Sequence, residues 1–351
     1  MKNLNPREAK DLPSEAIGED ELERPQPADE PIDRFAGGDL LTVMRGTIDR
    51  LQRDRTALGD LKILSRTIRE LRYAFKVFRP FRRRRKVTIF GSARTKPDHP
   101  QYLTAEGFAK RMAEHGWMVI TGAGGGIMEA GHKGAGREAS MGLNIMLPFE
   151  QSSNPYIEGD PKLVTLKYFF TRKLMFVKET SAIVCCPGGF GTLDETFETI
   201  TLLQTGKQTM VPVVLLDEPG GSYWKDLGVF LEKQLISGGL ASPEDVSLYK
   251  ITDSIDEAIE EVLKFYRVYH SLRYVREKLV FRIKKKLSDD RLAELAKRFA
   301  DILVEGTYEQ TTALPEESGE PEVADLPRLV FQFNRRNLGR LRMLIDFINE
   351  S

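Results

Sequence analysis

The chain has 351 residues, of which 41% are hydrophobic, and its 52 Lys and Arg residues balance 52 Asp and Glu residues. This length and apolar content allow a large core, and the charge balance excludes a protein built mainly to coat nucleic acid. No run approaches the roughly 18 apolar residues that a membrane helix needs, so we expect no membrane span. The only cysteines, Cys185 and Cys186, are adjacent. We therefore expect core thiols in a cytoplasmic protein.

The N-terminal part predicts a tail followed by a helical arm. Residues 1–33 are rich in Pro, Glu and Asp, so we expect them to be disordered. In 34–85, Leu and Ile recur at three- and four-residue steps, which predicts helix that packs on the main domain or on a second subunit. The basic run 82–86 suits a nucleic-acid or anionic-lipid site, but we favour a solvated junction.

Residues 86–266 alternate short apolar runs with amphipathic segments. We predict strands at 87–90, 117–121, 143–147, 163–167, 182–186, 211–216 and 248–251, with helices between them. Continuous apolar strands are typical of a sheet covered on both faces, and strand–helix alternation indicates parallel pairing. We therefore predict an α/β fold with a Rossmann-like, doubly wound parallel sheet and helical N- and C-terminal extensions.

The C-terminal part is expected to extend this domain with helices. We interpret 267–310 as a helical extension, 311–326 as an acidic linker and 327–351 as an amphipathic helix. That last helix suits a partner or a membrane surface, but docking on its own domain is the interpretation we favour.

The strongest candidate site is the loop Pro187-Gly-Gly-Phe-Gly-Thr, which joins an apolar strand to a helix. Glycines let a backbone approach phosphate oxygens closely, and the start of a helix attracts anions. We expect Gly188, Gly189, Gly191 and Thr192 to bind a phosphate. The alternative is a turn that needs glycine only for its conformation.

Two further strand-end loops are expected at the same crevice, beyond the carboxyl ends of the strands. Loop 122–126 would bring Gly124 and Gly125 to the phosphate, with Glu129 on the following helix, and loop 91–94 would add Ser92 and Arg94. Ile127 stands where a dinucleotide fingerprint has glycine, and the chain lacks a Walker A lysine pattern. These features argue against NAD binding and ATP hydrolysis.

Two charged residues stand out by position. Glu195 lies in the first turn of the helix after the 187–192 loop, where it either stabilises the helix start or reaches a ribose. Arg172 lies near the start of another helix, where a cation is unfavourable. It therefore serves a ligand or forms a surface salt bridge.

These residues resemble the LOG (Lonely Guy) family of cytokinin riboside 5′-monophosphate phosphoribohydrolases, which are often mislabelled lysine decarboxylases. The motif Pro-Gly-Gly-x-Gly-Thr-x-x-Glu is complete from Pro187 to Glu195, and Arg172-Lys173 matches the Arg-Lys pair of the preceding helix. The 122–128 loop resembles the other glycine loop of the family, and segments 147–151 and 154–156 resemble its bacterial branch. The resemblance covers about 86–266.

The resemblance implies hydrolysis of the N-glycosidic bond of a purine nucleoside 5′-monophosphate, whether AMP or an N6-modified form. Arg172 and Glu195 would be catalytic and Lys173 would bind substrate, with no cofactor or metal. It also implies a homodimer or higher homo-oligomer whose only other partner is the small-molecule nucleotide. Two alternatives stay open: a nucleotide-binding regulator without turnover, and a carrier or single-strand nucleic-acid-binding protein of Rossmann-like shape.

Overall fold

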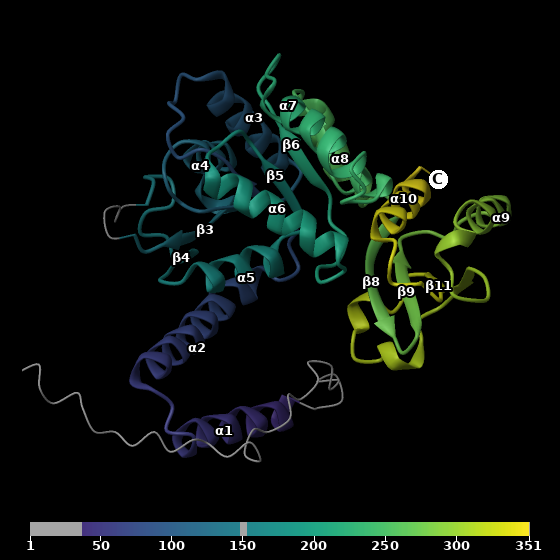
Figure 1. Cartoon of the computed structure of the whole chain (residues 1–351), viewed down its shortest axis with the longest axis horizontal. Helices are drawn as coiled ribbons and strands as arrows, with labels where there is room; N and C mark the ends of the chain where they lie inside the picture. Colours follow the sequence, from purple (N-terminus) through teal and green to yellow (C-terminus); the bar gives the residue numbers. More distant parts are fainter. Residues whose placement is uncertain (1–36, 148–152, 351) are drawn as a thin grey trace, which may run out of the picture. The chain divides into compact units, whose positions relative to one another are not determined.

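The computed structural model describes residues 37–147 and 153–350 (Figure 1). The predicted disorder at 1–33 lies outside these residues. The described chain divides into two compact units that meet between Ser65 and Arg66. We describe each unit by itself.

The first unit is helical, as the sequence predicted for this arm. It contains α1 (Gly37–Arg53) and the first residues of α2 (Leu58–Phe78). The helical conformation is interrupted between α1 and α2, where Arg55 takes the left-handed conformation with φ 51°. Large apolar side chains on α1, such as Leu41, Met44 and Ile48, are exposed.

The second unit begins within α2, which buries Glu70, Ala74 and Phe78 before η3 (Arg79–Phe81). Its centre is a sheet of seven strands, in the order β4-β3-β2-β1-β5-β6-β7. All six neighbouring pairs are parallel. The strands are β1 (Lys86–Phe90), β2 (Met118–Thr121), β3 (Ser140–Ile145), β4 (Leu163–Leu166), β5 (Ala182–Cys185), β6 (Val213–Leu216) and β7 (Lys250–Thr252).

Helices connect these strands and cover the sheet (Figure 1). They are α3 (Pro100–Glu114), α4 (Ile127–Ala139), α5 (Phe169–Glu179), α6 (Phe190–Gln204), α7 (Tyr223–Phe230) with the π-helical η4 (Leu231–Ile236), η5 (Pro243–Leu248) and α8 (Ile255–Phe265). Strands β1, β2, β5 and β6 are buried along their whole length, as a sheet covered on both faces requires. The predicted doubly wound, Rossmann-like α/β fold is confirmed.

The strand order places a topological switch point beside β1. From β1 the chain runs outward through β2, β3 and β4, and it then returns to add β5 on the other side of β1. In open α/β sheets a crevice forms where the strand order reverses, outside the carboxyl ends of the strands. The loops after β1 and β5 therefore face such a crevice.

The C-terminal part corrects the predicted helical extension at 267–310. Strands β8 (Tyr269–Val275), β9 (Lys278–Ile283), β10 (Glu309–Thr311) and β11 (Arg328–Phe331) form an antiparallel sheet in the order β10-β11-β9-β8. Only α9 (Asp289–Arg298) and the 3-10 turn η6 (Ala300–Ile302) are helical within that range. Strand β9 pairs on both edges, and its side chains from Leu279 to Ile283 are buried. This two-sided pairing outweighs local helix propensity.

The predicted acidic linker at 311–326 is also corrected, because it is ordered around a buried acid. Short 3-10 turns η7 (Pro315–Glu317) and η8 (Pro321–Val323) occupy it. Glu317 is buried and accepts hydrogen bonds from Arg282 Nε at 2.9 Å and Arg328 Nε at 2.8 Å. A carboxylate is held in such a place by paired cations.

The last helix is shorter than predicted for 327–351. α10 (Leu338–Asn349) starts where β11 and its turn have ended. It buries Leu341, Leu344 and Ile345, and Asn349 Oδ1 accepts a hydrogen bond from Val268 N at 2.8 Å. The helix thus docks on its own unit. Within 37–147 and 153–350, no helix is long and apolar enough to cross a membrane.

Candidate functional site

Ser92 joins three strand-end loops at the switch point. Its backbone N–H donates to Pro187 O at 3.1 Å, and its carbonyl accepts from Ile127 N at 3.0 Å. The loops after β1, β2 and β5 are therefore fixed against one another, as the sequence predicted for a shared crevice. Ser92 is half-buried among them.

The loop after β5 is packed at one glycine and open at two. A Cβ on Gly188 would lie 2.2 Å from Thr192 Oγ1 and 3.0 Å from Ser92 N, so glycine is needed there for close approach. Apart from chain neighbours and the backbone of α6 itself, no heavy atom of the described residues lies within 4 Å of a Cβ built on Gly189 or Gly191. α6 begins at Phe190 without a side-chain cap, and Thr192 N already donates to Gly189 O at 3.0 Å, so only the amides of Phe190 and Gly191 lack a partner from within the helix. This arrangement suits an anion.

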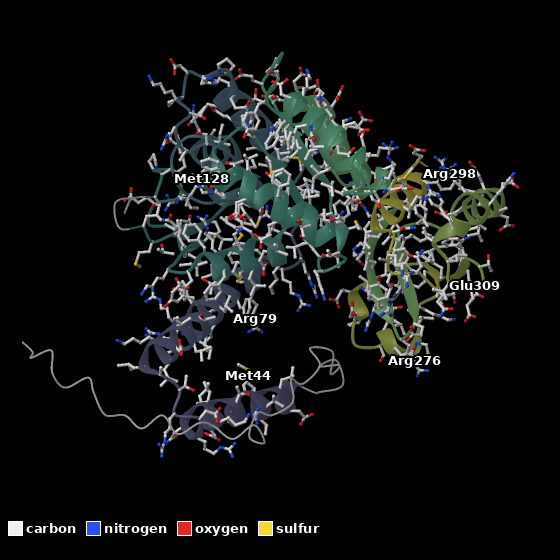
Figure 2. The ribbon with its side chains drawn as sticks, in the orientation of Figure 1. Met44, Arg79, Met128, Arg276, Arg298 and Glu309 are labelled. Carbon is white, nitrogen blue, oxygen red and sulfur yellow. The ribbon has the colours of Figure 1, made fainter. Side chains whose placement is uncertain are left out.

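The loop after β2 is held more tightly. Ala123 and Gly126 take left-handed φ values of 62° and 63°. A Cβ on Gly126 would lie 2.3 Å from Ser92 O. Met128, labelled in Figure 2, packs against the sites where Gly122 and Gly124 would carry side chains. Gly124 and Gly125 are nevertheless only half-buried, so the tip of this loop borders the crevice.

Arg172 and Glu195 form a buried charge pair between α5 and α6. Arg172 Nη2 lies 3.8 Å from Glu195 Oε1, and the two side chains are 14% and 9% exposed. This distance is long for an ion pair, and Arg172 Nε has no hydrogen-bond partner among the described residues. A Cβ on Gly122 would lie 3.6 Å from Arg172 Nη1, so the guanidinium faces the second glycine loop. The pair thus retains buried hydrogen-bonding capacity beside the crevice.

Burial tunes the acid of this pair. It raises the pKa of Glu195 to about 6, although the charges of Lys173 and Arg172 oppose the shift. Burial also lowers the pKa of Arg172, which the charge of Glu195 partly offsets. A carboxyl group that titrates near neutral pH beside a crevice marks a candidate functional site.

Lys173 points to different partners from those expected. Its Nζ lies 2.8 Å from Asp194 Oδ2 and 2.6 Å from Glu198 Oε2, so it links α5 to α6. Burial opposes its charge, but the hydrogen bonds to these two carboxylates raise the pKa of Lys173. The Lys173 ammonium is thus engaged by two carboxylates of α6.

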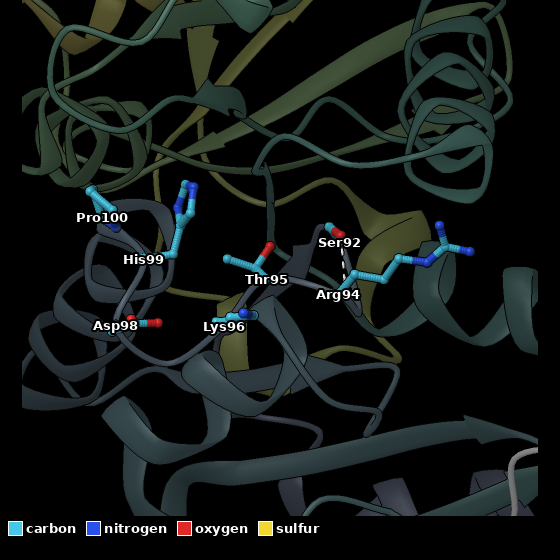
Figure 3. A pocket seen from close by; sticks show the side chains of 7 residues that line it. All are labelled: Ser92, Arg94, Thr95, Lys96, Asp98, His99 and Pro100. Atoms are coloured by element: carbon cyan, nitrogen blue, oxygen red, sulfur yellow. Dashed lines mark hydrogen bonds between the residues drawn. The ribbon is translucent and has the colours of Figure 1, made fainter.

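Arg94 and Glu129 flank the crevice. Arg94 is exposed, and in Figure 3 its guanidinium extends away from His99 and Pro100 along the rim of a cleft of about 620 Å³. Glu129 is half-buried and accepts a hydrogen bond from Tyr102 Oη at 3.3 Å. A Cβ on Gly125 would lie 3.9 Å from Glu129 Oε2. Glu129 thus stands beside the second glycine loop.

Sequence reasoning missed a second cleft of about 370 Å³ behind Gly188. It is lined by residues from three strand ends: Ser92, Thr95, His99, Gln101, Pro187, Gly188, Asp217, Glu218, Gly221, Ser222 and Tyr223. Tyr223 Oη donates to Gly188 O at 2.7 Å, and His99 Nδ1 lies 3.2 Å from Glu218 Oε2. The available signal was the pair Asp217-Glu218 directly after β6, since strand ends share one edge. No group in the described ranges has the His, Cys, Asp and Glu arrangement that holds a metal.

Fold and site together define a Rossmann-like α/β protein with a glycine-loop crevice at its switch point. Residues 123–262 match the family model described as "Possible lysine decarboxylase". This part of the chain is thus similar to that family, and curated relatives of modest identity confirm the resemblance to the LOG proteins.

Two of these relatives have modest identity to this chain. One is "Probable cytokinin riboside 5′-monophosphate phosphoribohydrolase LOGL5" of Oryza sativa subsp. japonica, 28% identical over 45% of this chain and 64% of its own length. The other is the "Cytokinin riboside 5′-monophosphate phosphoribohydrolase" of Mycobacterium marinum, 26% identical over 47% of this chain and 87% of its own length. The chain thus spans less than two thirds of the rice protein.

Solved structures of other proteins also resemble the chain. The molybdenum cofactor binding protein of Rippkaea orientalis is 18% identical, with a TM-score of 0.36, over 51% of this chain and 94% of its own. A TM-score of this size carries no argument about function.

Proposed function

We propose that the chain hydrolyses the N-glycosidic bond of a purine nucleoside 5′-monophosphate, releasing the free base and ribose 5-phosphate. The observation that carries this proposal is the buried Arg172–Glu195 pair, whose donors are incompletely used, beside an open glycine loop. The similarity to proteins named as phosphoribohydrolases supports the same chemistry.

The 5′-phosphate would bind at the start of α6. A Cβ on Gly189 or Gly191 would meet open space, and Thr192 adds a hydroxyl beside Gly188. Gly124 and Gly125 would border the phosphate on the other side, with Ser92 and Arg94 at its rim. Binding the phosphate away from the reacting bond can hold the ribose in position for cleavage.

Glu195 would act on the ribose side of the reaction. The bond between the anomeric carbon and the base nitrogen breaks through an oxocarbenium-like state, as in sugar hydrolysis. With a pKa of about 6, Glu195 is mostly ionised at pH 7 and can accept a proton from the attacking water. The water oxygen bonds to the anomeric carbon, the bond from that carbon to the base breaks, and the base leaves with the bonding electrons and gains the proton that the water gave to Glu195. Arg172 would stabilise the negative charge on the departing base.

We further propose that the enzyme is a cytoplasmic homodimer. Large apolar side chains on the helices of the charge pair are exposed: Phe169, Phe170, Leu174, Phe190 and Phe197. Exposed apolar groups that gather beside a functional site are typical of an interaction surface. A second copy would cover them next to the crevice. The cytoplasmic location is supported by Cys185 and Cys186, which are buried and unbridged.

The test is product analysis by chromatography after incubation with AMP, isopentenyl-AMP, GMP and CMP. We expect free base and ribose 5-phosphate from the purine nucleotides, and a loss of about 100-fold or more in kcat for Glu195→Gln. Glu198→Gln is the matched control, because Glu198 lies on the same helix and binds Lys173. Two results would overturn the proposal. One is release of base by Glu195→Gln at the wild-type rate. The other is a wild-type protein that releases base from none of the four nucleotides. Light scattering on the same sample reports the dimer.

A further inference from the structure

The second glycine loop holds a residue that needs external support. Ala123 is fully buried with φ 62°, a left-handed conformation that non-glycine residues seldom adopt. Such a conformation persists only when the surrounding structure imposes it. Three hydrogen bonds do so here. Ala123 N donates to Thr121 Oγ1 at 3.0 Å, Ala123 O accepts from Asn154 N at 2.8 Å, and Gly124 O accepts from Asn154 Nδ2 at 3.0 Å.

The imidazole of His132, on α4, supports the Asn154 amide from the side away from the loop carbonyl. His132 Nε2 lies 3.0 Å from Met141 O, and because a carbonyl only accepts, Nε2 carries the hydrogen. Burial lowers the pKa of His132 to about 4, so the ring is neutral at neutral pH and Nδ1 is an acceptor. Asn154 Nδ2 lies 3.1 Å from that nitrogen. Asn154 Oδ1 lies 3.3 Å from the same nitrogen, so Nδ2 is the closer amide atom and donates to both His132 Nδ1 and Gly124 O.

The opposite orientation of the amide is unfavourable. It would place Asn154 Oδ1 against Gly124 O, which is now the acceptor for Nδ2 at 3.0 Å. Gly124 O only accepts, so a buried hydrogen bond would be replaced by repulsion. His132 and Asn154 are both buried, which strengthens this selection because water does not compete.

We propose that His132 and Asn154 are positioning residues that hold loop 122–126 in the conformation that binds the substrate phosphate. The inference rests on the proposed function, because it assigns the loop to that phosphate. Neither side chain reaches the crevice, but Asn154 is bonded to the two loop residues that precede the tip at Gly125. Releasing Gly124 O would move the half-buried tip and weaken the grip on the phosphate. Since that grip is made in ground and transition states alike, its loss raises KM more than it lowers kcat.

The variants Asn154→Leu, His132→Leu and His132→Asn test this role. Asn154→Leu removes the donors, and His132→Leu removes the acceptor nitrogen that lies 3.1 Å from Asn154 Nδ2. His132→Asn restores an acceptor oxygen near the position of Nδ1. Met112→Ala is the matched control, because Met112 is fully buried on α3 outside the network. We expect KM for AMP to rise about tenfold in both leucine variants with kcat changed less than threefold, and His132→Asn to recover most of the loss.

Binding of AMP and of inorganic phosphate by calorimetry, in a Glu195→Gln background, separates this inference from the proposed function. Weaker binding of both ligands in the leucine variants, without hydrolysis by any form, would remove the proposed function and keep the positioning role. Binding by the leucine variants that matches Met112→Ala would overturn the positioning role, whether or not the wild type hydrolyses AMP. A failure of His132→Asn to improve on His132→Leu would also overturn it.

Discussion

The two glycine-rich loops of the crevice use glycine for different reasons. In the loop after β2, added side-chain atoms would meet Met128 at Gly122 and Gly124, and backbone at Gly126. In the loop after β5, Gly189 and Gly191 have open space where a side chain would start, and neither takes a left-handed φ. The first loop needs glycine to fold, whereas the second carries two glycines that the fold does not require.

This difference supports the proposal that the loop after β5 makes the closest approach to the ligand. Residues kept small without a packing reason leave room for a group that approaches the backbone closely. The loop after β2 is instead a rigid wall, fixed by Ser92 on one side and by Asn154 on the other. Substitutions in the loop after β2 should therefore mainly lower stability, and substitutions in the loop after β5 should mainly weaken ligand binding.

Gly126→Ala should give the largest loss of stability. A methyl group at this position would lie 2.3 Å from Ser92 O, and the residue would keep a left-handed φ. We expect the free energy of unfolding to fall by about 3 kcal/mol or more in chemical denaturation. Gly116→Ala is the control, because Gly116 has φ 80° but open space around its Cβ. Equal losses of unfolding free energy in the two variants would show that the left-handed φ alone, and not the clash with Ser92 O, accounts for the effect of Gly126→Ala.

Glu195, which lies beside the loop after β5, should make the free energy of unfolding depend on pH. Its pKa is raised from 4.5 to about 6, so the folded chain binds its proton more tightly than the unfolded chain. Below pH 4.5 both states are protonated and the group has no effect. As pH rises from 4.5 to 6, wild-type stability falls by about 2 kcal/mol, and the cost persists above pH 6.

The neutral variant Glu195→Gln avoids this cost. We expect its unfolding free energy to match the wild type near pH 4 and to exceed it by about 2 kcal/mol at pH 7 and above. Denaturation at a series of pH values measures the difference, with Glu198→Gln as the control. A gap that is constant with pH would mean that burial does not raise the pKa of Glu195.

The sheet and the crevice could be predicted from sequence because their signals are local. Apolar runs such as 182–186 end in glycine loops, and parallel strands bring such ends to one edge. The partners of Lys173 could not be predicted in this way. Spacing places it beside Arg172, but only the packing of α5 on α6 shows that Asp194 and Glu198 bind it.

The C-terminal sheet was missed because its signals depend on distant pairing. The β8–β9 hairpin turns at Arg276-Glu277, where Arg276 has φ 53°, without the Asn-Gly or Asp-Gly pair that marks such turns. Strand β10 has only three residues, and β11 is separated from its partner β9 by the acidic segment. Glu317 gives that segment its structure, but its partners Arg282 and Arg328 lie 35 and 11 residues away.

Gly191→Ala should have the smallest effect on stability, and it should stabilise the protein where Gly126→Ala destabilises it. Gly191 lies in the first turn of α6 with open space around its Cβ, so alanine fits without a clash. We expect the free energy of unfolding to rise by about 0.5–1 kcal/mol, because alanine favours helix and restricts the unfolded chain. AMP affinity, measured by calorimetry, should nevertheless fall about tenfold, because the methyl group occupies space that the phosphate needs. A more stable protein with unchanged AMP affinity would show that the open loop is not the phosphate site, and the contrast between the two loops would then concern folding alone.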